Sequence, residues 1–106
     1  MSPNVGFRLH PAAAIDITEI WEFIADDDLF AATRVREEFL KTFRLLAAFP
    51  YLGHSRPDLT PLPLRFHVVR SFLIAYMPEQ TPILVLAVLH GHRNPRTIAG
   101  LLKRRT

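Results

Sequence analysis

The apolar run at residues 83–89 is the feature that most constrains the fold. Seven apolar residues follow one another without interruption, and three of them are β-branched. Such a run is typical of a strand buried on both faces, although a short buried helix has the same periodicity. Pro82 precedes the run, and turn-forming residues follow it over 91–95. We therefore predict a central strand, whose C-terminal end carries His90, His92 and Arg93.

Two amphipathic helices are predicted before this strand. The first begins at Pro11, after a short candidate strand over residues 5–10, and the second covers residues 29–49 with Asp28 as its cap. A connection this short implies an antiparallel helical hairpin. The expected apolar stripes are Ile17, Ile20, Trp21 and Ile24, widened by Phe23, in the first helix, and Val35, Phe39, Phe43 and Leu46 in the second.

The C-terminal half predicts a meander of three antiparallel strands. Residues 64–68 alternate, with Leu64, Phe66 and Val68 inward, and 72–77 form an apolar strand that leads into the central one. A proline-rich connector over 49–63 precedes these strands. Ile98, Leu101 and Leu102 predict a short terminal helix, followed by a frayed basic tail at 103–105. The order βααβββα predicts one α+β domain over residues 1–106, with an N-terminal strand and helical hairpin packed on an antiparallel sheet.

Composition narrows the classes of protein that this chain can belong to. Residues 1–60 carry six Lys/Arg and nine Asp/Glu, whereas 61–106 carry seven Lys/Arg and one Glu, so the net charge changes from −3 to +6. A basic half suggests an acidic partner, and a solvated basic surface is the alternative. Without cysteine, the chain has no disulfide or thiolate metal site. Because it lacks a signal-peptide core and any apolar stretch of membrane-spanning length, we expect a cytoplasmic protein with no membrane contact.

Histidine and arginine are the candidate functional side chains. The pair His90 and His92 has a spacing found in metal sites, but no third ligand with supporting spacing accompanies it, so no cofactor is expected. Proton transfer or simple hydrogen bonding at a strand end are the other interpretations. Four arginines fall at predicted strand ends or outward positions, where they could bind a phosphate or carboxylate or merely discourage aggregation: Arg65, Arg70, Arg93 and Arg96.

Four short motifs follow one another along the chain: Asp16-Ile17-x-x-Ile20-Trp21-x-Phe23-Ile24-Ala25, Phe49-Pro50-x-x-Gly53-x-x-Arg56-Pro57-Asp58-Leu59, Leu64-Arg65 and Val88-Leu89-His90-Gly91-x-Arg93. This ordered set resembles the ParE/RelE superfamily of toxins from bacterial type II toxin–antitoxin modules. The resemblance covers nearly the whole chain. It implies the RelE/ParE-like fold and a cytosolic toxin held inactive by a cognate antitoxin, whose C-terminal segment would wrap the toxin surface.

The two branches of this superfamily imply different mechanisms. RelE-like members cleave mRNA on the ribosome, and ParE-like members poison DNA gyrase. The resemblance places Leu73 where RelE-like toxins have an arginine, and Ala99 near their C-terminal tyrosine. Neither side chain can hold a phosphate or move a proton, so His67, His90 or His92 would have to substitute. The ParE-like branch is therefore favoured.

We accordingly expect a ParE-like, plasmid-stabilising toxin that inhibits gyrase and is not itself an enzyme. Direct contact with nucleic acid is compatible with this expectation. Two alternatives remain: a RelE-like mRNA endonuclease that uses imidazoles as acid and base, and a non-toxic module that only binds its antitoxin. The expected target-binding residues are Arg65, Arg70, His90, His92, Arg93 and Arg96, with a contribution from the tail at 103–105.

Overall fold

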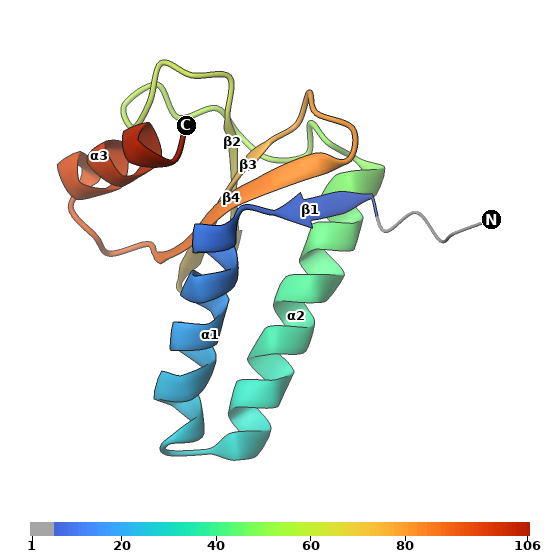
Figure 1. The fold of residues 1–106 in the computed structure, drawn as a ribbon, viewed down its shortest axis with the longest axis vertical. Coiled ribbons are helices and arrows are strands. Elements are labelled where there is room, and N and C mark those ends of the chain that lie inside the picture. Colours follow the sequence, from blue (N-terminus) through green and yellow to red (C-terminus); the bar gives the residue numbers. More distant parts are fainter. Residues whose placement is uncertain (1–5) are drawn as a thin grey trace.

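The computed structural model describes residues 6–106 and has the predicted order of elements (Figure 1). The α+β class and the βααβββα order are therefore confirmed. Val5, which the predicted first strand includes, lies outside the described residues. The elements are β1 (Phe7–Leu9), α1 (Pro11–Ala25), α2 (Leu29–Ala48), β2 (Arg65–Val69), β3 (Phe72–Met77), β4 (Ile83–His90) and α3 (Pro95–Arg105).

The four strands form one sheet in the order β1-β4-β3-β2. β4 lies between two neighbours and is buried over most of its length, which confirms the predicted central strand. β2, β3 and β4 form the predicted antiparallel meander. The sheet as a whole is mixed rather than antiparallel, because β1 pairs with β4 in parallel. The direction of pairing depends on which strands become neighbours in the sheet. The apolar periodicity of the sequence carries no information on which strands become neighbours.

The α1–α2 hairpin covers one face of the sheet and extends beyond its edge (Figure 1). Both helices begin at capped ends: Ala12 N donates to His10 Nδ1 at 3.0 Å, and Ala31 N donates to Asp28 Oδ1 at 3.1 Å. The predicted stripe of α2 is buried throughout. In α1 the prediction for Phe23 is wrong, because its ring is 77% exposed. Phe23 lies on the same flank of α1 as Asp16 and Glu19, where it borders an open groove beside the end of β4 and does not pack against the sheet.

The opposite face of the sheet is covered by α3 and by the connector between α2 and β2. Leu59 and Leu64 join Ile98 and Leu102 of α3 in a second core cluster. Val68, predicted to point inward, is 64% exposed. It follows Leu64 and Phe66 on the alternating pattern, but the covering layer ends before it. Among residues 6–106, no helix combines the length and the apolar character that crossing a bilayer requires.

A tyrosine anchors the proline-rich connector to the sheet. The buried Tyr76 hydroxyl donates to Pro50 O at 2.7 Å and accepts from Gly53 N at 3.0 Å. Gly53 has no room for a side chain, since a Cβ there would lie 2.7 Å from both Phe66 O and the Tyr76 hydroxyl. The connector is therefore fixed where it passes β2, as its prolines suggest.

Replacing Tyr76 with Phe is expected to destabilise the protein and to change its response to alkali. The Phe variant leaves Pro50 O and Gly53 N without their partner, at a cost of about 1–3 kcal/mol. Burial raises the pKa of Tyr76, so the folded protein keeps the phenol proton to higher pH than the unfolded chain. This contribution is fully present below about pH 10 and is lost as the pH rises above it.

Urea unfolding at pH 7 and at a series of alkaline pH values tests both effects. The wild-type protein should lose stability more steeply above pH 10 than Tyr76→Phe. Equal slopes, or equal stabilities at pH 7, would contradict this account of Tyr76.

Candidate functional site

The end of β4 presents an imidazole on an aromatic support. The His90 ring packs on Phe72, with ring centroids 4.8 Å apart. Just after the strand, Gly91 N donates to Ser71 O at 2.8 Å, and Arg93 N donates to His90 O at 3.3 Å. These bonds fix the backbone of the turn, while the side chains of His90, His92 and Arg93 remain exposed.

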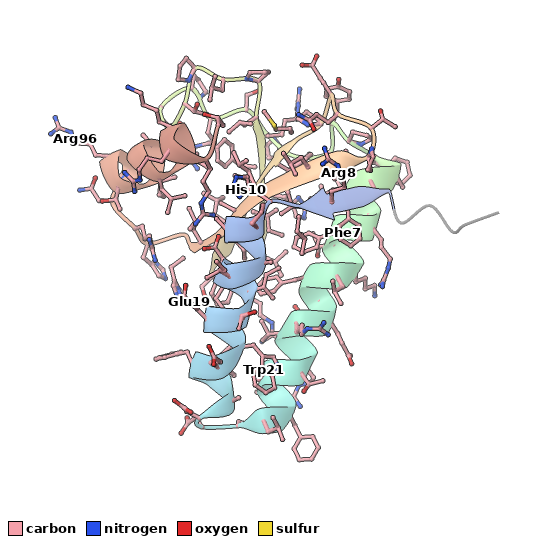
Figure 2. The ribbon with its side chains drawn as sticks, viewed as in Figure 1. Phe7, Arg8, His10, Glu19, Trp21 and Arg96 are labelled. Carbon is pink, nitrogen blue, oxygen red and sulfur yellow. The ribbon has the colours of Figure 1, made fainter. Side chains whose placement is uncertain are left out.

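The first turn of α3 continues this basic segment. Asn94 caps the helix, with its Oδ1 accepting from Arg96 N at 2.8 Å, and Pro95 occupies the first helical position. The exposed Arg96 side chain points away from the helical hairpin (Figure 2). Four of the predicted residues thus lie on one short exposed segment, which we call the basic rim: His90, His92, Arg93 and Arg96.

Beside the basic rim, a groove of about 280 Å³ separates α1 from the end of β4. Glu19 of α1 lines it opposite His90 and Arg93, so a carboxylate, an imidazole and a guanidinium border one space. Ile20 and Leu89 contribute apolar wall. Glu19 is exposed and lies on the outer side of α1 (Figure 2).

The other two predicted arginines are engaged within the protein. Arg65 Nη1 donates to Gly53 O at 2.7 Å and to Tyr51 O at 3.3 Å, and its guanidinium lies 5.0 Å from the Tyr51 ring centre. Arg65 is at the opposite end of β2 from the turn that contacts the basic rim. The structure therefore does not bring Arg65 together with the other candidates.

Arg70 lies at the same end of the sheet as His90, in the β2–β3 turn, but it binds α2. Its Nε donates to Glu38 Oε1 at 2.9 Å, and its Nη2 donates to Glu38 Oε2. Hydrogen bonds from Arg70 hold the pKa of Glu38 below its ordinary value. Arg70 also has a positive φ of 56°, an uncommon conformation for a residue with a side chain. The turn is thus tied to the helical hairpin.

The predicted frayed tail at 103–105 is instead the last turn of α3. Arg105 lies against Asp16 with a side chain only 14% exposed, so it cannot face a target as expected. A buried carboxylate partner 89 residues away orders this turn. Lys103 and Arg104 remain exposed.

His67 does not belong to the basic rim. It lies on β2 at the edge of the sheet, half-buried beside a groove of about 290 Å³ that His54 and Arg56 also line. Burial, together with the neighbouring His54, lowers the pKa of His67. Within residues 6–106, no three His, Cys, Asp or Glu side chains are grouped closely enough to hold a metal ion.

The helical hairpin carries a third groove, which the sequence did not predict. Its volume is about 410 Å³, and Trp21 lies between the two helices there (Figure 2). A smaller hollow of about 180 Å³ shares three of its residues and continues it toward β1. We call the larger hollow the hairpin groove; it is lined by Ile17, Thr18, Trp21, Thr33 and Arg36. The sequence placed Trp21 in the apolar stripe of α1, and in the structure this side chain is only half-buried and lines the hairpin groove.

Comparison with protein families gives one match over most of the chain. The model of the family described as ParE toxin of type II toxin-antitoxin system, parDE, matches residues 7–95. The matched region includes the helical hairpin, the whole sheet and the start of α3. A search of curated proteins finds no significant match to the chain.

Proposed function

The chain belongs to the ParE toxin family of type II toxin–antitoxin systems, and from that premise we propose that it poisons DNA gyrase until a cognate antitoxin neutralises it. In this proposal gyrase remains the catalyst. The toxin binds the complex of gyrase with cleaved DNA and slows religation.

The observation that supports this proposal most is the availability of the basic rim. Within residues 6–106, the ion pairs join Arg56 to Asp58, Arg70 to Glu38 and Arg105 to Asp16. None of them uses a side chain of the basic rim. The guanidinium groups of Arg93 and Arg96, which are exposed and take no part in these ion pairs, suit a surface that carries phosphates, because each contact of a cation with a phosphate releases condensed counterions. We propose that the basic rim binds gyrase where its cleaved DNA is held.

The hairpin groove is our proposed docking site for the antitoxin. Ile17 and Trp21 provide an apolar floor, and Arg36 provides a cation at the edge. An amphipathic segment with one acidic residue would bury its apolar side there and pair its carboxylate with Arg36. This site lies on the helical hairpin, whereas the basic rim lies between β4 and α3.

Replacing Trp21 with Ala is expected to weaken binding of the antitoxin while preserving the action on gyrase. Loss of a central aromatic anchor costs at least about 2 kcal/mol of binding free energy, or roughly thirtyfold in Kd. Isothermal titration with the purified antitoxin measures this loss. Phe30→Ala, an exposed aromatic at the hairpin tip, is the control. Unchanged antitoxin affinity in Trp21→Ala would refute the docking site.

A second candidate function rests on the groove between α1 and β4. Glu19, His90 and Arg93 border it, and a carboxylate, an imidazole and a guanidinium are the groups that could cleave RNA. Leu73, which stands where RelE-like toxins have an arginine, is buried in the sheet. If mRNA cleavage is the activity, changing both His90 and His92 to Ala should abolish it, whereas gyrase binding should retain the guanidinium contacts.

The deciding experiment is a supercoiling assay with purified gyrase and refolded, antitoxin-free protein. Accumulation of linear, cleaved plasmid is expected, and added antitoxin should suppress it. Normal gyrase turnover with well-folded protein would overturn the proposal, and cleavage of mRNA on ribosomes would then be measured. If expression of the chain alone causes no growth defect, the non-toxic, antitoxin-binding alternative is supported instead.

A further inference from the structure

The most buried ion pair in the described part of the chain joins the two ends of the fold. Arg105 Nη1 lies 2.6 Å from Asp16 Oδ2, and Nη2 lies 3.0 Å from Oδ1, so the contact is bidentate. The two side chains are 14% and 11% exposed, whereas the partners of the other two pairs are 42–55% exposed. This difference in burial sets the pair apart from ordinary surface ion pairs.

The pair also completes an irregular edge of the sheet. β1 pairs with one edge of β4 and ends at Leu9. After it, His10 N donates a hydrogen bond to Val85 O on the same edge. Beyond this point β4 contains a bulge, because Tyr76 pairs with Val85 while Ala75 pairs with Ala87. The additional residue is Leu86.

β1 does not extend along β4 as far as the bulge. There the side chains of Asp16 and Arg105 bond to the backbone of β4 instead. Arg105 Nη1 donates to Leu86 O at 3.0 Å, and Val88 N donates to Asp16 Oδ2 at 3.0 Å. Two main-chain groups of β4 thereby find partners: the carbonyl of the bulge residue Leu86 and the N–H of Val88, two residues further on. Side chains of α1 and α3 thus meet the backbone of β4 at one point.

The basic rim lies on the segment that this contact holds. At one end Gly91 N is bonded to Ser71 O, and at the other end Ile98 and Leu102 pack in the core. Arg105 follows Leu102 by one helical turn and fixes the end of α3. The direction of α3 determines where Arg96 stands relative to Arg93 and His90.

Physical considerations favour a geometric role for the pair over a stabilising one. Removing two charges from water offsets most of their attraction, so a buried ion pair adds little net stability. A planar guanidinium that binds two carboxylate oxygens and a carbonyl does define distance and orientation closely. We propose that Asp16 and Arg105 position α3, and with it the basic rim, for binding to the target. The target-binding part of this inference rests on the proposed function.

Arg105→Gln tests the proposal, and Arg104→Gln is the matched control for the position of α3. Arg104 is the preceding residue of the same helix turn, has the same charge and is exposed. The chain contains no cysteine, so Lys103→Cys on α3 and Arg44→Cys on α2 can carry spin labels without background. A single narrow distance distribution is expected for the parent and for Arg104→Gln, and a broadened one for Arg105→Gln.

Function is measured on the parent and on Arg105→Gln without labels. The concentration of Arg105→Gln that gives half-maximal cleaved plasmid should be about tenfold higher than that of the parent. In this variant the segment that carries the basic rim and α3 becomes ordered only on binding, and the entropy lost in ordering it weakens binding. The affinity of this variant for the antitoxin should remain unchanged, whereas a general folding defect would lower that affinity as well. If Arg105→Gln does not fold, Arg105→Lys keeps the charge but not the bidentate geometry, and should show intermediate changes in both measurements.

A narrow distance distribution in Arg105→Gln would overturn the positioning role. A broadened distribution with unchanged potency on gyrase would overturn the link between the position of α3 and target binding. If the wild-type protein does not trap cleaved DNA, the proposed function fails together with that link, while the distance measurement still decides whether the pair positions α3.

Discussion

Changing both Arg93 and Arg96 to Glu is expected to abolish the trapping of cleaved DNA while leaving the fold intact. Both side chains are exposed, and neither takes part in an ion pair within residues 6–106. The substitution changes the local charge by four units, from attraction to repulsion of phosphates. Like charges placed at an interface cost several kcal/mol, so the concentration required for half-maximal cleavage should rise by about 100-fold or more.

The control is the same double charge reversal at Arg34 and Arg44. These exposed arginines of α2 lie on the helical hairpin, away from the basic rim. The control variant has the same change in net charge, but at a site away from the basic rim. It should therefore match the wild-type protein in the plasmid assay. Circular dichroism and urea unfolding should show both variants folded. A variant of Arg93 and Arg96 that loses activity by unfolding, or one that keeps full potency, would contradict the role assigned to the basic rim.

The elements of the fold were predictable because burial leaves a periodic signal in this sequence. The apolar run of β4 and the stripe of α2 each correspond to surfaces that are buried in the structure. The errors have a common origin in the limits of the covering layers. Phe23 and Val68 continue the predicted patterns, but Phe23 borders the open groove between α1 and the end of β4, and the connector stops short of the end of β2. Periodicity reports the direction of a side chain and not the extent of what covers it.

The candidate site was predictable only in part, because contacts between residues far apart in the sequence decide which basic side chains remain free at the surface. Arg65, Arg70 and Arg105 look like Arg93 and Arg96 in the sequence. The structure binds the first three internally, to main-chain oxygens near Gly53, to Glu38 and to Asp16. These contacts span 12, 32 and 89 residues, and no local pattern encodes them. The basic rim is what remains after those pairings, so its composition follows from the fold.

Replacing Phe39 with Ala is expected to have the largest effect on stability. Phe39 is 1% exposed, and its ring lies 6.5 Å from that of Phe43 and 5.4 Å from that of Phe72, the latter edge-on. Removing it leaves a cavity between α2 and the sheet and should lower the free energy of unfolding by about 3–5 kcal/mol. For a domain whose total stability is about 5–15 kcal/mol, that is a large fraction.

Phe30→Ala supplies the matched control, because it is the same substitution in the same helix. Phe30 is 77% exposed, so its loss should change the free energy of unfolding by no more than about 0.5 kcal/mol. Urea unfolding at pH 7 measures both variants. The antitoxin should restore part of the lost stability of Phe39→Ala, since a ligand that binds only the folded state raises its population. Similar costs for the two variants would mean that α2 does not pack on the sheet through the face described, and the placement of the hairpin groove would then fail as well.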